Sequence, residues 1–250
     1  MGRYTFEKVH KNHTITAVFT ASQKLNGVDR WLNTRDHIAY LSGYPDGTFG
    51  PSRSMTRAEA AAIFARLLAE KNGDTISTAA NTKFADIPAH AWYSGYVKYL
   101  SNNGITYGKS KTIFAPNDAI TRAEFTTMAV RFFDVYGDGD AEIMEQFSGF
   151  NDVSSGYWAA KYIKYAALHG WINGYGDGSF HAEREINRAE VVTIVNRLLG
   201  READEDYIAD NLRKLNTFPD VSRKHWAYYA VMEAANAHTA VLGESESWSK

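Results

Sequence analysis

The stretch Ile120-Thr121-Arg122-Ala123-Glu124 decides the fold, because the chain carries three versions of it. Met55-Thr56-Arg57-Ala58-Glu59 places its arginine 65 residues earlier, and Ile186-Asn187-Arg188-Ala189-Glu190 places its arginine 66 residues later. A sequence that resembles itself at a fixed period is typical of a repeat architecture. The chain is therefore predicted to be an array of three units.

Each arginine motif predicts the start of an amphipathic helix. Apolar residues follow the arginine at helical spacing, for example Ile63, Phe64 and Leu67 after Arg57, and this spacing places them on one face. A Thr or Asn stands before each arginine and a Glu follows two residues after it, which is the capping-box pattern of a helix N-terminus. We therefore interpret the three glutamates as capping residues rather than catalytic acids: Glu59, Glu124 and Glu190.

A second motif, Phe-x-Asp followed by Trp six residues after the Asp, also occurs three times. It predicts a second helix with the Trp at its start, and its copies are Phe84/Asp86/Trp92, Phe150/Asp152/Trp158 and Phe218/Asp220/Trp226. The first unit carries Ala21 where this Asp is expected, whereas the last copy has no arginine motif after it. We therefore expect the segment 218–238 to dock beside 43–69 and close the array into a ring.

Two regions depart from the helical pattern. His238 takes the place of the glycine that is expected to end the second helix in the other units, at Gly104 and Gly170. The run at 14–19 is rich in β-branched residues and predicts a strand. A short β segment is therefore expected before the helical array.

Composition excludes several classes of function. The 27 basic and 29 acidic residues leave a net charge of -2, which gives no reason to expect a nucleic-acid partner. No run of eighteen apolar residues is present, so no membrane insertion is predicted. The chain has no cysteine, its histidines are scattered and it contains no HExxH motif, so we predict no enzyme, no metal site and no cofactor. Signal-peptide features are missing after Met1, and we therefore expect the chain to be a piece of a longer precursor.

The coupled motifs resemble the S-layer homology (SLH) domain of bacterial surface proteins. The resemblance rests on Phe-x-Asp, Trp, a helix, Asp-Gly-x-Phe and Ile-Thr-Arg-Ala-Glu, and it extends from residue 36 to about residue 240. It implies a mainly α fold in which three repeats form a pseudo-threefold helical bundle, with a short N-terminal β segment. The opening residues resemble the end of an internalin-type B-repeat. The implied divisions are a β fragment (1–22), a first repeat with an atypical first half (23–82), two further repeats (83–148 and 149–216) and a C-terminal half-repeat that completes the ring (217–250).

The same resemblance implies noncovalent anchoring to the envelope of a Gram-positive bacterium. Such domains are implied to bind secondary cell-wall polysaccharide, in several members through pyruvylated N-acetylmannosamine, and to hold a larger surface protein outside the cell at the wall or S-layer. An arginine at the first position of a helix suits this role, because free backbone N–H groups, the helix dipole and a planar guanidinium all favour a carboxylate.

The resemblance also carries binding roles onto particular residues. Arginines would hold the anionic sugar, aspartates would orient the arginines or accept sugar hydroxyls, tryptophans would form apolar walls, and glycines would let the backbone approach the ligand. The residues are Arg57, Arg122, Arg188, Asp86, Asp152, Asp220, Trp92, Trp158, Trp226, Gly43, Gly108 and Gly174.

Several alternatives remain open on the sequence alone. The arginines and aspartates can form structural ion pairs beside the caps, the tryptophans can belong mainly to the core, and the array can serve self-assembly or protein docking without a glycan. A groove using Arg57 and Asp220 is the least regular, because the opening unit lacks an ordinary first half. Calcium binding and sugar hydrolysis are weaker alternatives. The loop at 138–142 does not match EF-hand spacing, and the acidic residues recur in every repeat instead of forming one differently tuned pair.

Overall fold

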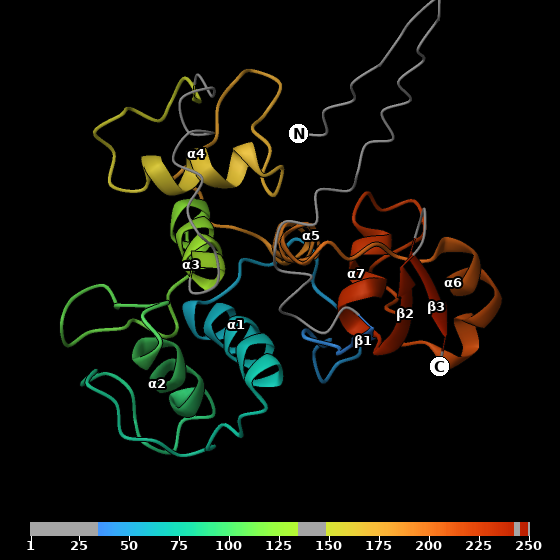
Figure 1. Ribbon diagram of the computed structural model, residues 1–250, viewed down its shortest axis with the longest axis horizontal. Helices are drawn as coiled ribbons and strands as arrows, with labels where there is room; N and C mark the ends of the chain where they lie inside the picture. The colour runs from blue at the N-terminus through green and yellow to red at the C-terminus, as the bar shows by residue number, and fades with distance from the viewer. Residues whose placement is uncertain (1–34, 135–148, 243–245, 250) are drawn as a thin grey trace, which may run out of the picture.

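Three pairs of helices surround a common centre in the computed structural model, which describes residues 35–134, 149–242 and 246–249 (Figure 1). Each pair consists of an inner helix that begins at a motif arginine and an outer helix that packs against it. The pairs are α1 (Arg57–Asn72) with α2 (Ser94–Asn102), α3 (Arg122–Asp134) with α4 (Ala160–Leu168), and α5 (Arg188–Leu199) with α7 (Tyr228–Ala235). The predicted mainly α fold is confirmed.

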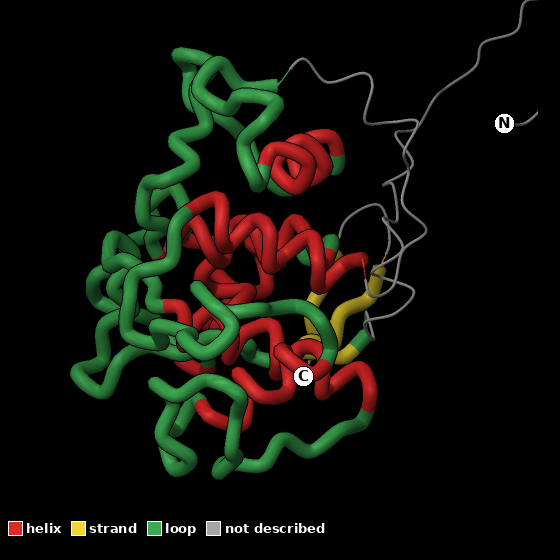
Figure 2. The backbone as a smooth tube through the Cα atoms, turned by 90° about the vertical axis from the view of Figure 1, so that its left-hand side faces the viewer, coloured by secondary structure: helices red, strands yellow, loops and turns green. Residues whose placement is uncertain are grey.

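A small antiparallel sheet lies beside α6 and α7 (Figure 1). Its order is β1 (Asp36–His37), β2 (His238–Leu242) and β3 (Glu246–Ser249), so the first described strand pairs with a strand near the C-terminus. Helix α6 (Glu205–Asn211), followed by a 3-10 turn at Leu212–Lys214, precedes α7. In the side view, loops gather on the side of the molecule opposite the sheet (Figure 2).

Some predictions fall on parts of the chain outside these ranges. The strand predicted at 14–19, the resemblance to a B-repeat and the Asp-Gly-rich loop at 138–142 all lie outside the described residues. Among the helices that the structure describes, none combines the length and the apolar character that crossing a bilayer requires.

A ring of three backbone hydrogen bonds lies where the repeats meet. The Met55 amide donates to the Ile186 carbonyl (2.9 Å), the Ile186 amide to the Ile120 carbonyl (3.0 Å), and the Ile120 amide to the Met55 carbonyl (2.9 Å). Each residue stands two positions before a motif arginine. Because the bonds form a closed cycle of equivalent positions, the arrangement has the pseudo-threefold character that the resemblance implies.

The inner helices begin as the capping-box pattern predicts. In α1 the Thr56 side chain accepts from the Glu59 amide while Glu59 accepts from the Thr56 amide, and Asn187 and Glu190 do the same in α5. The equivalent bonds also start α3. Each cap contributes about 1 kcal/mol. The caps therefore fix the first residue of each inner helix, which is the motif arginine.

The outer helices begin two residues after each Trp, not at the Trp as predicted. The residues before them form turns, and none of α2, α4 and α7 has a side-chain cap. Gly104 and Gly170 both have φ of 72°, so the chain leaves α2 and α4 through a left-handed glycine as expected. His238 begins β2 instead, which explains why the third unit lacks this glycine.

Pairs of phenylalanines join the two kinds of motif. The phenylalanine of each Phe-x-Asp motif packs on the phenylalanine that precedes a motif arginine by eight residues. The ring centroids are 5.4 Å apart for Phe84 and Phe114, 5.2 Å for Phe150 and Phe180, and 5.3 Å for Phe218 and Phe49. The last pair brings the segment that precedes α7 against the first repeat.

Candidate functional site

The motif arginines are buried where neighbouring repeats meet. Arg57, Arg122 and Arg188 are only 4%, 5% and 2% exposed. Each Nε donates to the carbonyl of a phenylalanine in another repeat, at 2.8 Å to Phe114, 2.9 Å to Phe180 and 2.8 Å to Phe49 respectively. The arginines therefore tie each repeat to the next.

Glutamates, not aspartates, are the ionic partners of these arginines. Arg57 lies 3.1 Å from Glu124, and Arg122 lies 3.2 Å from Glu190. Arg188 lies 3.7 Å from Glu59. The capping glutamate of one repeat thus also pairs with the arginine of another. The alternative of a structural ion pair named aspartate as the partner of each arginine, and this is wrong. In the described ranges, every ion pair of a motif arginine is formed with a glutamate.

Burial and pairing act in opposite directions on the charges. Burial lowers the pKa of the Arg57 guanidinium, and the neighbouring Glu124 partly opposes this shift. Burial alone would raise the pKa of Glu124, but hydrogen bonds from Lys109 and from the Thr121 amide, together with Arg57, outweigh burial and lower it. The ion pair is therefore retained at neutral pH.

Each aspartate of the Phe-x-Asp motifs holds a loop by two backbone N–H groups. Asp152 accepts from the amides of Phe180 and His181, both at 2.7 Å. Asp86 binds the amides of residues 114 and 115 in the same way, and Asp220 binds those of residues 49 and 50. The carbonyl of the first residue in each pair receives a motif arginine. The aspartates therefore orient the arginines through the loop rather than by direct contact.

The structure does not pair Arg57 with Asp220, the combination considered from the sequence. Asp220 belongs with Arg188, because both bind the backbone of Phe49, while Arg57 is served by the loop that Asp86 holds. In the part of the chain that the structure describes, Arg57 and Asp220 therefore contact different loops. The Phe218 ring also packs on Phe49, so the segment before α7 lies against the loop that Arg188 contacts.

The same backbone bonds perturb the aspartates. Slight burial would raise the pKa of Asp152, but the amides of Phe180 and His181 outweigh it, so the pKa lies below its ordinary value of 3.8. The pKa of Asp220 is lowered in the same way. Both carboxylates are ionised at neutral pH.

The three glycines are required by the packing of a phenylalanine ring. A Cβ on Gly43, Gly108 or Gly174 would lie 2.5 Å from Cε1 of the phenylalanine of a Phe-x-Asp motif, which is Phe218, Phe84 and Phe150 respectively. Such a distance forces a neighbouring atom to move. The structure thus gives these glycines a packing role.

The tryptophans lie on the surface. Trp92, Trp158 and Trp226 are 54%, 53% and 65% exposed. The alternative that they belong mainly to the core is therefore wrong. Three large aromatic side chains at equivalent positions remain open to solvent.

Two grooves bring a motif arginine, a glycine, a capping glutamate and a tryptophan together. One has a volume of about 240 Å³ and is lined by Arg57, Gly108, Glu124, Arg131 and Trp158, among others. We call it groove 1.

The second, groove 2, has a volume of about 200 Å³ and uses equivalent positions, which are Arg122, Gly174, Glu190, Arg197 and Trp226. Groove 1 combines Arg57, residues 105–131 and Trp158, and groove 2 combines Arg122, residues 172–197 and Trp226. Neither groove is therefore formed by a single repeat. The third arginine, Arg188, has equivalent contacts with Glu59 and with the Ser42 carbonyl.

Sequence reasoning missed a second arginine in each groove. An arginine stands nine residues after each motif arginine. Arg66 follows Arg57, Arg131 follows Arg122, and Arg197 follows Arg188. Arg131 lies over the rings of Tyr107 and Tyr162, at 4.7 and 5.1 Å. The recurrence of an arginine nine residues after each motif arginine is the sequence signal for this second arginine. The helix prediction rested on the apolar positions and did not include it.

Positive charge exceeds negative charge at both grooves. Glu124 is shared by Arg57 and Lys109, and Glu190 is shared by Arg122 and Arg184. Within the described ranges, no acidic side chain forms an ion pair with the second arginine of either groove. An anionic group is thereby favoured in both places.

Comparison with known protein families gives three matches along the chain, all to one domain. The model of the S-layer homology domain matches residues 40–61, 83–126 and 149–192. The chain carries three S-layer homology domains. Their matched segments contain the three arginine motifs and two of the three Phe-x-Asp motifs.

Several relatives are surface proteins. The chain is 35% identical over 219 residues to Cell surface glycoprotein 1 of Acetivibrio thermocellus, covering 84% of this chain and 9% of the relative. It is 31% identical over 228 residues to the Cellulosome-anchoring protein of the same organism, covering 90% of this chain and 48% of the relative. It is 26% identical over 174 residues to S-layer protein EA1 of Bacillus anthracis, covering 68% of this chain and 19% of the relative. The chain thus spans less than half the length of these relatives.

These similarities establish the general role of the S-layer homology domains. The triplet is a noncatalytic module that anchors surface proteins to the cell wall, and it places the chain outside the cell at the wall or S-layer.

Proposed function

We propose that grooves 1 and 2 bind secondary cell-wall polysaccharide through an acidic terminal sugar of the pyruvylated N-acetylmannosamine type. The observation that carries the proposal is the recurrence of one set of side chains, in which an exposed tryptophan, a buried arginine, its glutamate partner and a second arginine line the same groove. The same set in two places argues for one ligand chemistry.

The exposed tryptophan supplies the apolar part of the site. An indole that is more than half exposed forgoes burial free energy that a core position would give it. The flat apolar face of a sugar ring can cover it. Trp158 and Trp226 are therefore assigned to stack on the sugar in grooves 1 and 2.

The second arginine supplies the charge. The motif arginine already has a glutamate and a carbonyl as partners, so its guanidinium is largely used within the fold. Arg131 and Arg197 have no acidic partner in the described ranges, and both line a groove. A planar guanidinium can bind a carboxylate by two hydrogen bonds. We therefore assign the ketal carboxylate to this second arginine and a supporting role to the motif arginine.

Retention on a wall needs more than one groove. A hydrogen bond to a charged group contributes about 1.5–3 kcal/mol, which alone gives weak binding. Grooves 1 and 2 on one module raise the overall affinity, because the second contact is intramolecular. We also propose that the repeats divide as 23–82, 83–148 and 149–216, with 217–250 completing the ring, and the contact of Phe218 with Phe49 supports this.

The proposal is tested by sedimentation with purified Gram-positive cell walls. Walls are used intact, after chemical removal of the polysaccharide, and after removal of its pyruvate. We expect loss of binding in both treated samples, and at least a tenfold loss on intact walls for the double variant Trp158→Ala/Trp226→Ala. The control is Val241→Ala, which truncates an exposed apolar side chain in the sheet.

The results separate this proposal from assembly without a glycan. Because both tryptophans are exposed, the double variant should keep the helicity of the wild type. Binding that is indifferent to polysaccharide removal would overturn the proposal. Concentration-dependent self-association in the absence of walls would then favour the alternative.

A further inference from the structure

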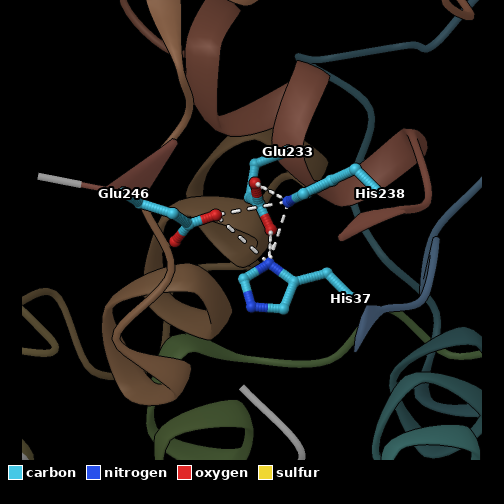
Figure 3. A group of neighbouring side chains, drawn as sticks. All are labelled: His37, Glu233, His238 and Glu246. Atoms are coloured by element: carbon cyan, nitrogen blue, oxygen red, sulfur yellow. Dashed lines mark hydrogen bonds and ion pairs between the residues drawn. The ribbon is translucent and has the colours of Figure 1, made fainter. Parts of the chain in front are cut away.

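Four buried ionisable side chains meet beside the sheet and take no part in the grooves. They are His37, Glu233, His238 and Glu246, which we call the His/Glu cluster (Figure 3). Their exposed fractions are 3%, 0%, 7% and 7%. They come from β1, α7, β2 and β3, so they are assembled only by the fold.

The ligand atoms of the cluster face one another at the spacing of a metal's coordination shell. His37 Nδ1 lies 2.9 Å from His238 Nε2, 3.1 Å from Glu233 Oε1 and 3.3 Å from Glu246 Oε1. His238 Nε2 lies 3.2 Å from Glu246 Oε1 and 3.4 Å from Glu233 Oε2. Zinc bonds to nitrogen and oxygen of about 2.0–2.2 Å in a tetrahedron separate the ligands by about 3.3–3.6 Å. The distances in the cluster are equal to these separations or up to a few tenths of an ångström shorter, so small shifts of the side chains around an ion convert the cluster into a tetrahedral shell.

One histidine is held in the form that a metal requires. His238 Nδ1 lies 2.9 Å from the carbonyl oxygen of Asn236. A carbonyl only accepts, so Nδ1 carries the proton and the lone pair of a neutral ring is on Nε2, which points into the cluster. A hydrogen bond from the second ring nitrogen to a carbonyl is the usual outer support of a metal-binding histidine.

Glu246 is held in place by similar outer contacts. Its Oε2 accepts from the Glu202 amide at 2.9 Å, and its Oε1 accepts from Trp248 Nε1 at 3.0 Å. The Trp248 ring stacks on His238 with centroids 3.8 Å apart. These contacts position two of the four side chains before any ion is present.

The charges of the cluster call for a cation. Glu233 is fully buried, and its Oε2 has no hydrogen-bond partner. Within the described ranges, no lysine or arginine forms an ion pair with Glu233 or Glu246. Two buried carboxylates need compensation, which either protonated histidines or a bound cation can supply. A divalent cation bound by two neutral histidines and two carboxylates leaves no net charge.

We infer that the His/Glu cluster is a binding site for a divalent transition-metal cation, with Zn²⁺ as the preferred occupant. Imidazole nitrogen with carboxylate oxygen in four-fold coordination suits Zn²⁺, whereas Ca²⁺ and Mg²⁺ take six or more ligands that are mainly oxygen. Four protein ligands and the deep burial leave no position for a substrate, so the site is structural. The site includes His37 and His238, which are 201 residues apart in the sequence. A bound ion would therefore link the first described strand to the C-terminal strands.

Metal binding by the whole chain, purified without a histidine tag and dialysed against EDTA, tests the inference. Calorimetric titration with Zn²⁺ should give one ion per chain, and Co²⁺ should give the visible absorption of a tetrahedral complex. With free Zn²⁺ a hundred times above Kd, the Tm should rise by roughly 5–11 °C and fall back after EDTA is added.

Variants separate the cluster from other binding. His238→Gln and His37→Gln should each abolish one-to-one Zn²⁺ binding and the Co²⁺ absorption, while His90→Gln, at an exposed histidine outside the cluster, should keep both. Absence of saturable binding by the wild type would overturn the inference, as would unchanged binding by both cluster variants. The wild-type stoichiometry and Co²⁺ spectrum decide even where a variant does not fold. None of these readings depends on wall binding.

Discussion

The substitution Gly174→Ala isolates one packing contact on which the loop before α5 depends. An added Cβ would lie 2.5 Å from Phe150 Cε1, 2.8 Å from Phe150 Cδ1 and 2.6 Å from the Ser179 carbonyl oxygen. The backbone at this glycine is not left-handed, so the effect is steric and involves no conformational strain. Relief requires the Phe150 ring to move away, which loosens its stacking on Phe180.

The expected cost follows from these distances. Overpacking by a methyl group costs about 1–3 kcal/mol, and replacement of a glycine returns about 0.4–1 kcal/mol through the unfolded state. We expect a net loss of about 1 kcal/mol in the free energy of unfolding. For a chain of this size that corresponds to a decrease in Tm of roughly 2–4 °C.

Urea unfolding followed by circular dichroism measures this loss, and the same loop offers a matched control. A Cβ on Gly176 would have no atom within 4 Å, so Gly176→Ala should be neutral or slightly stabilising. The double variant Gly174→Ala/Phe150→Leu should cost less than the sum of its two single changes. Equal stability of the two alanine variants would refute the packing argument. Unchanged stability together with lost wall binding would instead support the role in ligand approach.

Three further outcomes follow from burial and charge. Arg122→Ala should lower the free energy of unfolding by about 1–3 kcal/mol, because the Phe180 carbonyl loses its donor; a loss within the error of urea titration would contradict this. Asn187→Ala should cost about 1 kcal/mol by removing the cap of α5, which a decrease in Tm with unchanged helicity would check. The pKa of Asp152 is lowered by folding, so its contribution to stability is complete at neutral pH and is lost as the pH falls below about 4. Between pH 6 and pH 3 the urea midpoint should therefore fall more steeply in the wild type than in Asp152→Asn, and parallel curves would contradict it.

The repeat pattern was sufficient to predict the inner helices and their caps. Thr56 and Glu59 are close in sequence, and the capping box that they form depends only on local geometry. The start of each outer helix was misplaced by two residues, because the residues after Trp92 form a turn that no side chain caps.

Partners that come from other repeats could not be predicted from local pattern. The sequence suggested an Arg–Asp pair, yet the arginine reaches a glutamate 67 or 68 positions away, and the aspartate serves a loop instead. The same limit applies to the His/Glu cluster. His37 and Glu246 stand near opposite ends of the sequence, and only the pairing of β1 with β2 brings them together.

The closed cycle formed by Met55, Ile120 and Ile186 has a consequence for folding. In an open solenoid each repeat contacts only its neighbours along the chain, so repeats can be lost from an end and the rest stays folded. Here every repeat is a neighbour of both others, and removal of any one leaves two unpaired backbone groups at the centre. We therefore expect the three repeats to unfold in one cooperative transition. A single repeat, cut out and expressed alone, should remain unfolded.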